Sequence, residues 1–455
     1  MDKRDSTMFR TFTRVGTRAG AASLALFAPA VALAQDAVPA AADAVVATVD
    51  KGDTAWMMVA TVLVMAMIVP GLALFYGGLV RTKNMLSVLT QIIAVASLAM
   101  IIWVTYGYTM AFGDGGNAFI SGFGKAFLSG VTADSTVATF TDGVEIPEYV
   151  FIAFQMTFAA ITVSLVVGGL VERLKFSALM IFAAVWLTIV YFPVAHMVWA
   201  GNGLLFNWEP AALDFAGGTV VHINAGVSAL VGAMLLGPRL GYKKDVMAPH
   251  SLVMTLIGTG LLWVGWFGFN AGSALEANGS AGLALINTFV ATASGVLFWM
   301  LTERALGHKG SLLGACSGAI AGLVAVTPAA GNAGPFGAIV LGAAAAVICA
   351  LFVVSVKPRL KLDDSLDAFG IHGIGGIVGS IGTAFTYAQI AGDDYDLGAQ
   401  LLTQVIAVAI VIVWAAAGSF IAFTIARLAT GLRVSEEVER EGLDLGEHGE
   451  RAYNY

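Results

Sequence analysis

Residues 217–236 read Gly-Gly-Thr-Val-Val-His-Ile-Asn-Ala-Gly-Val-Ser-Ala-Leu-Val-Gly-Ala-Met-Leu-Leu, a run without Asp, Glu, Lys or Arg. As an α-helix with a rise of about 1.5 Å per residue, this run would cross the ~30 Å hydrocarbon core of a bilayer. One ionisable side chain, His222, lies inside it. Because ionisable groups are costly in a membrane, the run predicts both a transmembrane helix and a functional position on it.

Apolar runs without charged residues make up most of the chain. Further charge-free runs occur at 55–80, 85–112, 149–171, 176–200, 251–275, 281–302, 311–330, 334–356, 368–390 and 397–426. The 455 residues are 58% hydrophobic and only 12% charged, whereas a soluble domain is about 25% charged. Backbone polar groups in lipid must be satisfied within each segment. We therefore expect an all-α polytopic membrane protein with eleven transmembrane helices.

The basic residues predict the orientation of these helices. Alternate connections between the runs carry Arg81 and Lys83; Arg173 and Lys175; Arg239, Lys243 and Lys244; Arg304 and Lys309; and Lys357, Arg359 and Lys361. Of the other connections, one carries a basic residue, Lys125. Basic connections stay in the cytoplasm, so the mature N-terminus is expected outside and the C-terminus inside.

The first residues have the pattern of a secretory signal peptide. Five basic residues precede the apolar stretch Ala21–Ala34, which ends in Ala-Leu-Ala. A twelfth span is the alternative, but this stretch is too short to cross a bilayer. We expect a signal peptide at 1–34, a periplasmic leader at 35–54, a membrane domain at 55–426 and a cytoplasmic tail at 427–455. The protein would then lie in a cell inner membrane.

Two positions indicate an internal inverted repeat of five helices plus five, followed by a final helix. Asp214 precedes His222 by eight residues, and Asp364 precedes His372 by eight residues. Residues 74–78 and 268–272, at the ends of the first and sixth spans, are also alike. Coincidence in a glycine-rich chain is the alternative. A repeat of this kind predicts a site near the membrane midplane.

The two histidines are expected to meet near the membrane centre. His222 would lie about 12 Å from the outer end of its span and His372 about 12 Å from the inner end of its own. In a core ~30 Å thick, these depths differ by only ~6 Å. A lone histidine could simply bond a backbone carbonyl. A pair at one depth predicts rings that bond each other and line a passage for a small hydrogen-bonding molecule.

Aromatic residues predict an entrance on the outer side. Trp199 ends the fourth span, Phe269 and Ser273 end the sixth, and Phe154 and Phe158 lie deeper in the third. Aromatic faces attract cations and a serine oxygen can accept from them, although an interfacial anchor is the plainer role for a terminal tryptophan. Asp214 is placed to cap the fifth span.

Several stretches carry a family resemblance. They are Asp214-Phe-Ala-Gly-Gly-Thr-Val-Val-His222-Ile-Asn224, Pro70-Gly-Leu-Ala-Leu-Phe-Tyr-Gly-Gly-Leu79, Gly265-Trp-Phe-Gly-Phe-Asn-Ala-Gly-Ser273, Gly314-Ala-Cys-Ser-Gly-Ala-Ile-Ala-Gly322 and Phe369-Gly-Ile-His-Gly373, with Glu441-Gly-Leu-Asp444 and His448-Gly-Glu450 in the tail. In this order they resemble the ammonium transporter/methylammonium permease/Rhesus family, and in particular its bacterial branch.

The resemblance implies a transporter of ammonium, ammonia and methylammonium that serves nitrogen metabolism. It implies an outer cation site at Trp199, Ser273 and Phe158, a gate of stacked Phe158 and Phe269, and a twin-histidine pore at His222 and His372. The residue at Asp214 would be needed for transport and would support the outer site. The resemblance also implies a homotrimer with one pore per subunit, a trimeric PII signalling protein on the cytoplasmic face, and a tail that packs under the subunits.

Other functions are weaker readings of the same sequence. An ammonium sensor with little flux is the main alternative, although only a short tail follows the last span. The metal-ligand and catalytic motifs of a membrane enzyme are absent, and the spans contain no carboxylates of the kind a sodium-coupled transporter needs. We expect no cofactor, no metal and no nucleic-acid partner.

Overall fold

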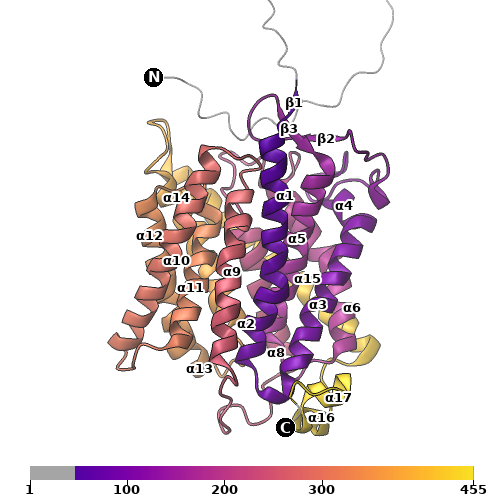
Figure 1. Ribbon diagram of the computed structural model, residues 1–455, viewed down its shortest axis with the longest axis vertical. Helices are drawn as coiled ribbons and strands as arrows, with labels where there is room; N and C mark the ends of the chain where they lie inside the picture. The colour runs from indigo at the N-terminus through magenta and orange to yellow at the C-terminus, as the bar shows by residue number, and fades with distance from the viewer. Residues whose placement is uncertain (1–46, 454–455) are drawn as a thin grey trace, which may run out of the picture.

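The computed structural model describes residues 47–453 and is mostly helical, as predicted. Within this part of the chain, 11 helices are long and apolar enough to cross a membrane. Figure 1 shows them as one bundle with different structures at its two ends. The end that carries the strands is called the strand end below, and the end that carries α16 and α17 is called the tail end.

The first five spans are each continuous in space but most are built from more than one helical segment. They comprise α1 (Lys51–Ala66), η3 (Met67–Leu72) and α2 (Ala73–Leu79); α3 (Met85–Ile102), η5 (Trp103–Gly107) and α4 (Tyr108–Phe112); α5 (Glu148–Val166); α6 (Phe176–Trp186), η8 (Leu187–Tyr191) and α7 (Phe192–Trp199); and η9 (Gly218–Ile223) with α8 (Asn224–Leu236).

The remaining spans include both single helices and spans built from more than one segment. They comprise α9 (Leu252–Gly272); α10 (Gly279–Ala305); α11 (Leu312–Val326); α12 (Pro335–Leu351), η11 (Phe352–Val356) and α13 (Lys357–Leu360); η12 (Phe369–Gly373) with α14 (Ile374–Tyr387); α15 (Leu397–Thr430); and, in the tail, α16 (Glu436–Glu441) and α17 (Leu443–His448). Short 3-10 turns occupy Thr82–Asn84, Ala126–Leu128, Val167–Gly169 and Thr327–Ala329.

Three short strands cover the strand end. β1 (Thr48–Val49) pairs in parallel with β3 (Val144–Pro147), which pairs antiparallel with β2 (Thr136–Ala138). The strands lie outside the predicted spans. Thr48 N donates to Gly143 O at 2.9 Å, so this sheet ties the residues that precede α1 to the loop that precedes α5.

Helix ends differ slightly from the predicted span boundaries. α1 begins at Lys51 because Asp50 caps it by accepting from Asp53 N at 2.9 Å, so the helix takes in part of the predicted leader 35–54. α15 continues past 426 to Thr430, with Arg427 in its last turn. The predicted signal peptide at 1–34 and the leader up to residue 46 lie outside the described residues.

Six of the eleven spans in the described residues contain a π-helical turn. The charge-free runs in the sequence did not predict these turns. Two of these turns, η9 and η12, hold the two predicted pore histidines. η9 opens the fifth span and η12 opens the tenth. A π turn widens the helix and is frequent at functional sites, so the histidines occupy a special backbone segment in both halves.

The two histidine-bearing helices pack against each other reciprocally. A Cβ on Gly226 of α8 would lie 2.5 Å from Gly373 Cα, and a Cβ on Gly376 of α14 would lie 3.0 Å from Gly218 O. Each helix therefore places a small residue, just past its histidine, against the π turn of the other. This exchange is the packing that an inverted repeat produces, because equivalent elements of the two halves meet.

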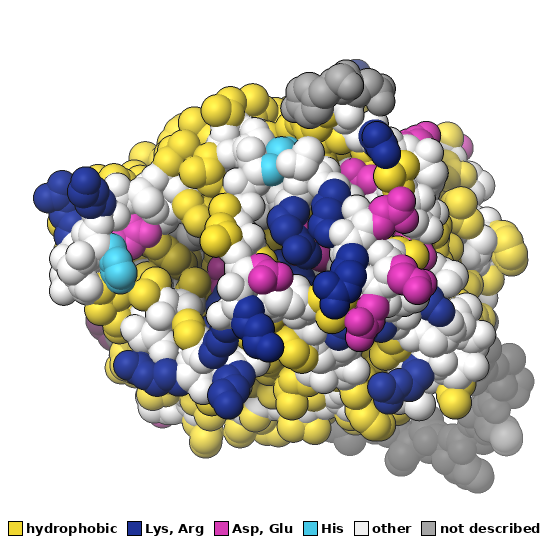
Figure 2. Space-filling model, turned by 90° about the horizontal axis from the view of Figure 1, so that it is seen from below, with side chains coloured by type: hydrophobic (Ala, Val, Ile, Leu, Met, Phe, Trp, Pro, Cys, Tyr) yellow, Lys and Arg dark blue, Asp and Glu magenta, His cyan; other side chains and the backbone are white. Residues whose placement is uncertain are grey.

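The basic connections gather at the tail end. Figure 2 views this face and shows Lys and Arg side chains across it, with acidic side chains among them. Arg81 and Arg239 both bind the carboxylate of buried Glu172 at 2.9 Å. Burial opposes ionisation of Glu172, but Arg239 and Arg81 together lower the pKa of its carboxyl group. This arginine–carboxylate network joins three connections between spans at the tail end.

Candidate functional site

His222 and His372 meet inside the bundle, as the depth argument predicted. Their Nδ1 atoms lie 3.2 Å apart, and the two rings are nearly parallel, with centroids 5.3 Å apart. The side chains are 1% and 4% exposed. Because a neutral imidazole has one donor and one acceptor nitrogen, a bond between two Nδ1 atoms directs the Nε2 atoms outward. His222 Nε2 is buried and has no hydrogen-bond partner in the described part of the chain.

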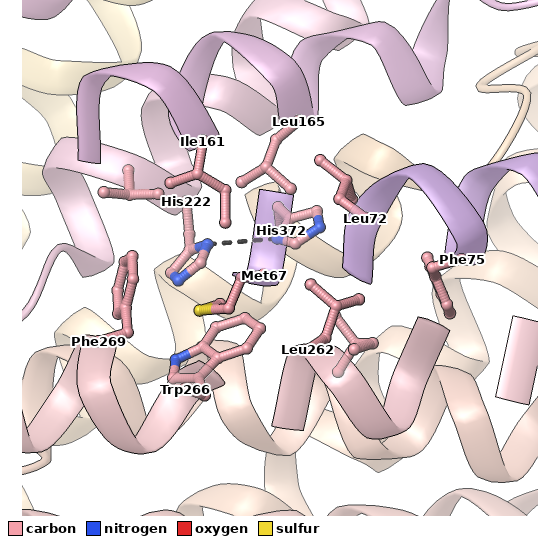
Figure 3. A pocket seen from close by; sticks show the side chains of 12 residues that line it. Met67, Leu72, Phe75, Ile161, Leu165, His222, Leu262, Trp266, Phe269 and His372 are labelled. Carbon is pink, nitrogen blue, oxygen red and sulfur yellow. Dashed lines mark hydrogen bonds between the residues drawn. The ribbon is translucent and has the colours of Figure 1, made fainter. Parts of the chain in front are cut away.

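The histidine pair borders a narrow cavity of about 10 Å³, roughly the space that one water-sized molecule needs. Figure 3 shows both rings pointing into it, joined by their hydrogen bond. The remaining lining is apolar or aromatic: Met67, Leu72, Phe75, Ile161, Leu165, Val221, Leu262, Trp266, Phe269 and Ile320. Trp266 Nε1 donates to Thr327 Oγ1 at 3.0 Å, so its polar atom is already satisfied. The imidazole nitrogens are therefore the polar atoms that this cavity offers to a small molecule.

A series of rings leads from the cavity toward the strand end. Phe269 lies 6.1 Å from His222 and stacks on Phe158 with centroids 4.2 Å apart and an angle of 20°. Phe158 in turn contacts Trp199 edge-on at 5.8 Å and Phe154 at 4.9 Å. The stacked pair Phe158 and Phe269 is buried and separates the histidines from Trp199. The structure thus brings together all four aromatic residues that the sequence selected.

Ser273 and Asp214 are held beside these rings. Ser273 Oγ donates to Phe269 O at 2.8 Å, one turn from the stacked ring. Trp199 Nε1 donates to Asp214 O at 2.9 Å. The serine oxygen keeps its lone pairs and the tryptophan is fixed by its N–H. Aromatic faces and an acceptor oxygen are suited to a small cation.

The carboxylate of Asp214 caps the helix that carries His222, as predicted. Its Oδ1 accepts from Gly217 N at 2.9 Å and Gly218 N at 2.5 Å. Its Oδ2 accepts from Thr219 N at 2.9 Å, from Val220 N at 3.2 Å and from the Thr219 hydroxyl. Burial raises the pKa of Asp214, and the hydrogen bonds from Thr219 oppose that shift. Both carboxylate oxygens of Asp214 already accept hydrogen bonds. Asp214 therefore affects the rings by fixing the start of the helix that carries His222 and by accepting, at its backbone oxygen, from Trp199 Nε1.

Known proteins share this sequence and this architecture. The model of the ammonium transporter family matches residues 55–453. This chain belongs to the ammonium transporter family. The ammonium transporter of Aquifex aeolicus is 46% identical over 415 residues, which are 89% of this chain and 94% of that protein. The family and such relatives are transporters, not enzymes.

Solved structures of the family superpose on this ammonium transporter family member. Mep2 of Saccharomyces cerevisiae has a TM-score of 0.75 at 32% identity, covering 85% of this chain and 88% of that one. A structure named Sensor Amt Protein has a TM-score of 0.80 at 26% identity, covering 87% and 98%. The same eleven-helix architecture therefore occurs in proteins with both kinds of name.

In this ammonium transporter family member, the second histidine helix has a different cap. Asp364 Oδ2 accepts from Phe369 N at 2.9 Å and from Gly370 N at 3.0 Å. Its Oδ1 is buried and has no hydrogen-bond partner in the described part of the chain. Burial, and then the negative charge of Asp367, raise the pKa of Asp364 to about 6, although Lys357 opposes the shift.

Trp266, which lines the cavity, was not among the residues selected from the sequence. It stacks on His222 with centroids 5.4 Å apart, while His372 bonds Nδ1 of the same ring. An apolar aromatic residue in a transmembrane helix usually indicates packing, so composition gives no signal for it. Its position in the quoted Gly265–Ser273 motif, next to Phe269, was the one available sign.

Proposed function

We propose that the ring series and the histidine pair form the transport path for ammonium. Ammonium is recruited at the strand end by Trp199, Ser273 and Phe158, with Phe154 behind them. It loses a proton at the gate of Phe158 and Phe269 and passes His222 and His372 as ammonia. The observation that carries this proposal is the histidine pair, which presents imidazole nitrogens in an otherwise apolar cavity.

Desolvation is the physical reason for deprotonation. The Born cost of moving a monovalent ion into a medium of low dielectric is of order 20 kcal/mol, while a neutral polar molecule loses only a few kcal/mol. Aromatic contacts of about 0.5–2 kcal/mol each cannot offset the larger cost. When an N–H bond of ammonium breaks, the electron pair stays on nitrogen and the proton leaves separately. Potassium has no proton to lose, so this path would exclude it.

The histidine pair also offers a route for the separate proton. Two imidazole rings joined through Nδ1 can accept a proton at one Nε2 and release one at the other, because each ring has two nitrogen atoms that exchange roles. Transport would then carry charge even though the species that crosses the apolar cavity is neutral. Ammonium-induced current is the measurable consequence.

Purified protein in liposomes tests the proposal. The wild type should take up ammonium and methylammonium, give an ammonium-induced current and exclude potassium. The double variant His222→Ala/His372→Ala should lose this combination, while His308→Ala, at an exposed histidine between α10 and α11, should behave as the wild type. Potassium-excluding transport by the double variant would contradict the histidine role. Potassium conduction by the wild type would contradict the deprotonation step.

A sensor with little flux is not favoured, because the relative at 46% identity is a transporter and the structure with a sensor name is 26% identical. The two functions separate in the same liposomes. Ammonium binding without uptake would identify a sensor, whereas uptake that saturates with ammonium would identify a transporter.

We also propose the cellular setting that the sequence implied. The protein would be an inner-membrane homotrimer with the strand end in the periplasm and the tail end in the cytoplasm, where a PII protein would bind. The basic face in Figure 2 supports this orientation through the positive-inside rule. N-terminal sequencing of mature protein would test cleavage after Ala34, and cross-linking in the membrane would test the trimer.

A further inference from the structure

The chain between α4 and α5 carries three exposed phenylalanines that the transport path does not use. Residues 115–131, here called the aromatic loop, read Gly-Gly-Asn-Ala-Phe-Ile-Ser-Gly-Phe-Gly-Lys-Ala-Phe-Leu-Ser-Gly-Val. Phe119, Phe123 and Phe127 are 43%, 62% and 76% exposed. Large apolar side chains grouped on a surface indicate that something covers them.

The aromatic loop is firmly attached to the bundle. His196 is buried in α7, and its Nε2 donates to Asn117 O at 2.8 Å. Thr109 Oγ1 in α4 donates to Gly122 O at 2.8 Å. Lys125, the one charged residue of the loop, turns inward and binds the buried carboxylate of Glu148 at 2.6 Å. The loop therefore presents its phenylalanines from a fixed base and presents no charge beside them.

Several backbone N–H groups along the loop have hydrogen-bond partners. Asn117 N donates to Ile120 O, Ser121 N to Met110 O, Ala126 N to Phe123 O, and Leu128 N to Lys125 O, all within 3.1 Å. Phe127 and Leu128 hold φ values of 54° and 57°, which bulky residues rarely adopt. Each satisfied backbone group lowers the free-energy cost of placing the loop in a low-dielectric environment.

Contacts with α15 place the Phe119 ring at membrane depth. Phe119 stacks on Trp414 with ring centroids 5.9 Å apart and an angle of 11°. Trp414 Nε1 donates to Ile189 O at 3.0 Å, and Ile189 lies ten residues before the end of its span at Trp199. That is about 15 Å along the helix. The Phe119 ring therefore lies below the strand end, within the leaflet on that side.

We propose that the aromatic loop is seated in the membrane and that Phe119, Phe123 and Phe127 insert among the acyl chains of the strand-end leaflet. The stacking of Phe119 on Trp414 joins the loop to α15, in which the neighbouring residue Val413 is 67% exposed. The inward turn of Lys125 removes the charge that would hold the loop in water. The proposal rests on the chain spanning a membrane and is independent of transport.

Spin labels on single cysteines test this placement in liposomes. Phe123→Cys and Phe127→Cys are labelled with a nitroxide, and collision with oxygen, which concentrates in lipid, is compared with collision with a water-soluble nickel chelate. Val413→Cys provides the lipid reference, and Val246→Cys, 89% exposed between α8 and α9, provides the water reference. The native Cys316 and Cys349 are buried, and labelled wild type measures any signal from them.

The labels at 123 and 127 should collide preferentially with oxygen, as the label at 413 does. Preferential collision with the chelate, as at 246, would overturn the proposal by placing the loop in water. Protection from both reagents, with spin–spin broadening that disappears on dilution with unlabelled protein, would overturn it by placing the loop against a second copy. Ammonium uptake by each variant verifies that it is folded.

Discussion

The two histidine helices share a spacing and a backbone but not a cap. Asp214 and Asp364 each precede a π turn and stand eight residues before their histidines. The Asp214 carboxylate accepts bonds on both oxygens, whereas one oxygen of Asp364 is buried without a partner in the described chain. The same sequence pattern thus gives one carboxylate whose two oxygens both accept hydrogen bonds and one carboxylate with an oxygen that accepts none in the described chain. The difference predicts that equivalent substitutions in the two halves have unequal effects.

Asparagine in place of Asp214 or Asp364 should give the largest difference in stability and uptake between the two halves. In Asp214→Asn, the amide N–H₂ must face donors, because N–H groups approach both carboxylate oxygens. Buried donors left without an acceptor cost about 1–3 kcal/mol each. We expect a loss of about 2–4 kcal/mol in the free energy of unfolding on this basis, and little ammonium uptake.

Asp364→Asn is the matched variant. Its carbonyl oxygen can still accept from Phe369 N and Gly370 N while its N–H₂ takes the place of the unpartnered oxygen. We expect a smaller loss than at Asp214, because no existing buried donor loses its acceptor, although the new N–H₂ is itself a buried donor. Denaturation in detergent, with uptake in liposomes, measures both variants. Equal losses at the two positions would show that the caps are equivalent.

The pH dependence of stability should distinguish the same carboxylates. The pKa of Asp364 rises from 3.8 in the unfolded chain to about 6 in the fold, mainly through burial. Between those values the folded protein holds more protons than the unfolded protein, so its stability falls as pH rises from about 4 to about 6 and then levels off. The full effect is at most about 3 kcal/mol.

The difference in unfolding free energy between wild type and Asp364→Asn isolates this contribution. Other buried acids, including Asp214, are common to both proteins and cancel in the difference. The wild type should lose stability relative to the variant between pH 4 and pH 6. A difference that stays constant across this range would mean that Asp364 keeps an ordinary pKa in the fold.

Alanine at Gly226 and Gly376, the two glycines at the contact between the histidine helices, should lower stability and uptake by smaller amounts, again unequally. The added Cβ of Gly226→Ala would lie 2.5 Å from Gly373 Cα, a rigid backbone atom, so the two histidine helices must separate. Overpacking of this kind costs about 1–3 kcal/mol. We expect reduced uptake as well, because His372 is adjacent to Gly373.

Gly376→Ala meets less resistance, since its nearest contacts are at 3.0–3.1 Å. We expect it to retain more stability and more uptake than Gly226→Ala. Gly260→Ala in α9, where a Cβ meets nothing within 4 Å, is the control and should resemble the wild type. The prediction fails if Gly376→Ala is the more damaging of the two glycine variants.

Much of the site could be predicted because its signals lie in single spans. Charge-free runs located the helices, and two histidines at equal depth indicated their pairing. The charge-free runs gave no sign of the π turns, and the unequal caps were missed although their cause is local. Asp364 lacks a hydroxyl partner since Phe369 stands where Thr219 stands in the other half. Spacing alone does not show which of two similar carboxylates is satisfied.

Thr219→Val tests that last distinction and should have the smallest effect. The variant keeps the shape of the side chain and removes one donor to Asp214, while the backbone N–H groups of Thr219 and Val220 still reach Oδ2. One hydrogen bond to a charged group contributes about 1.5–3 kcal/mol, and the remaining donors reduce the loss to about 1 kcal/mol. Thr383→Val in α14 removes a hydroxyl that bonds only Gly379 O within its own helix, and it should cost less. If the two variants are equally stable, the hydroxyl does not explain why the caps differ, and the cause must lie in the charges of Asp367 and Lys357 around Asp364.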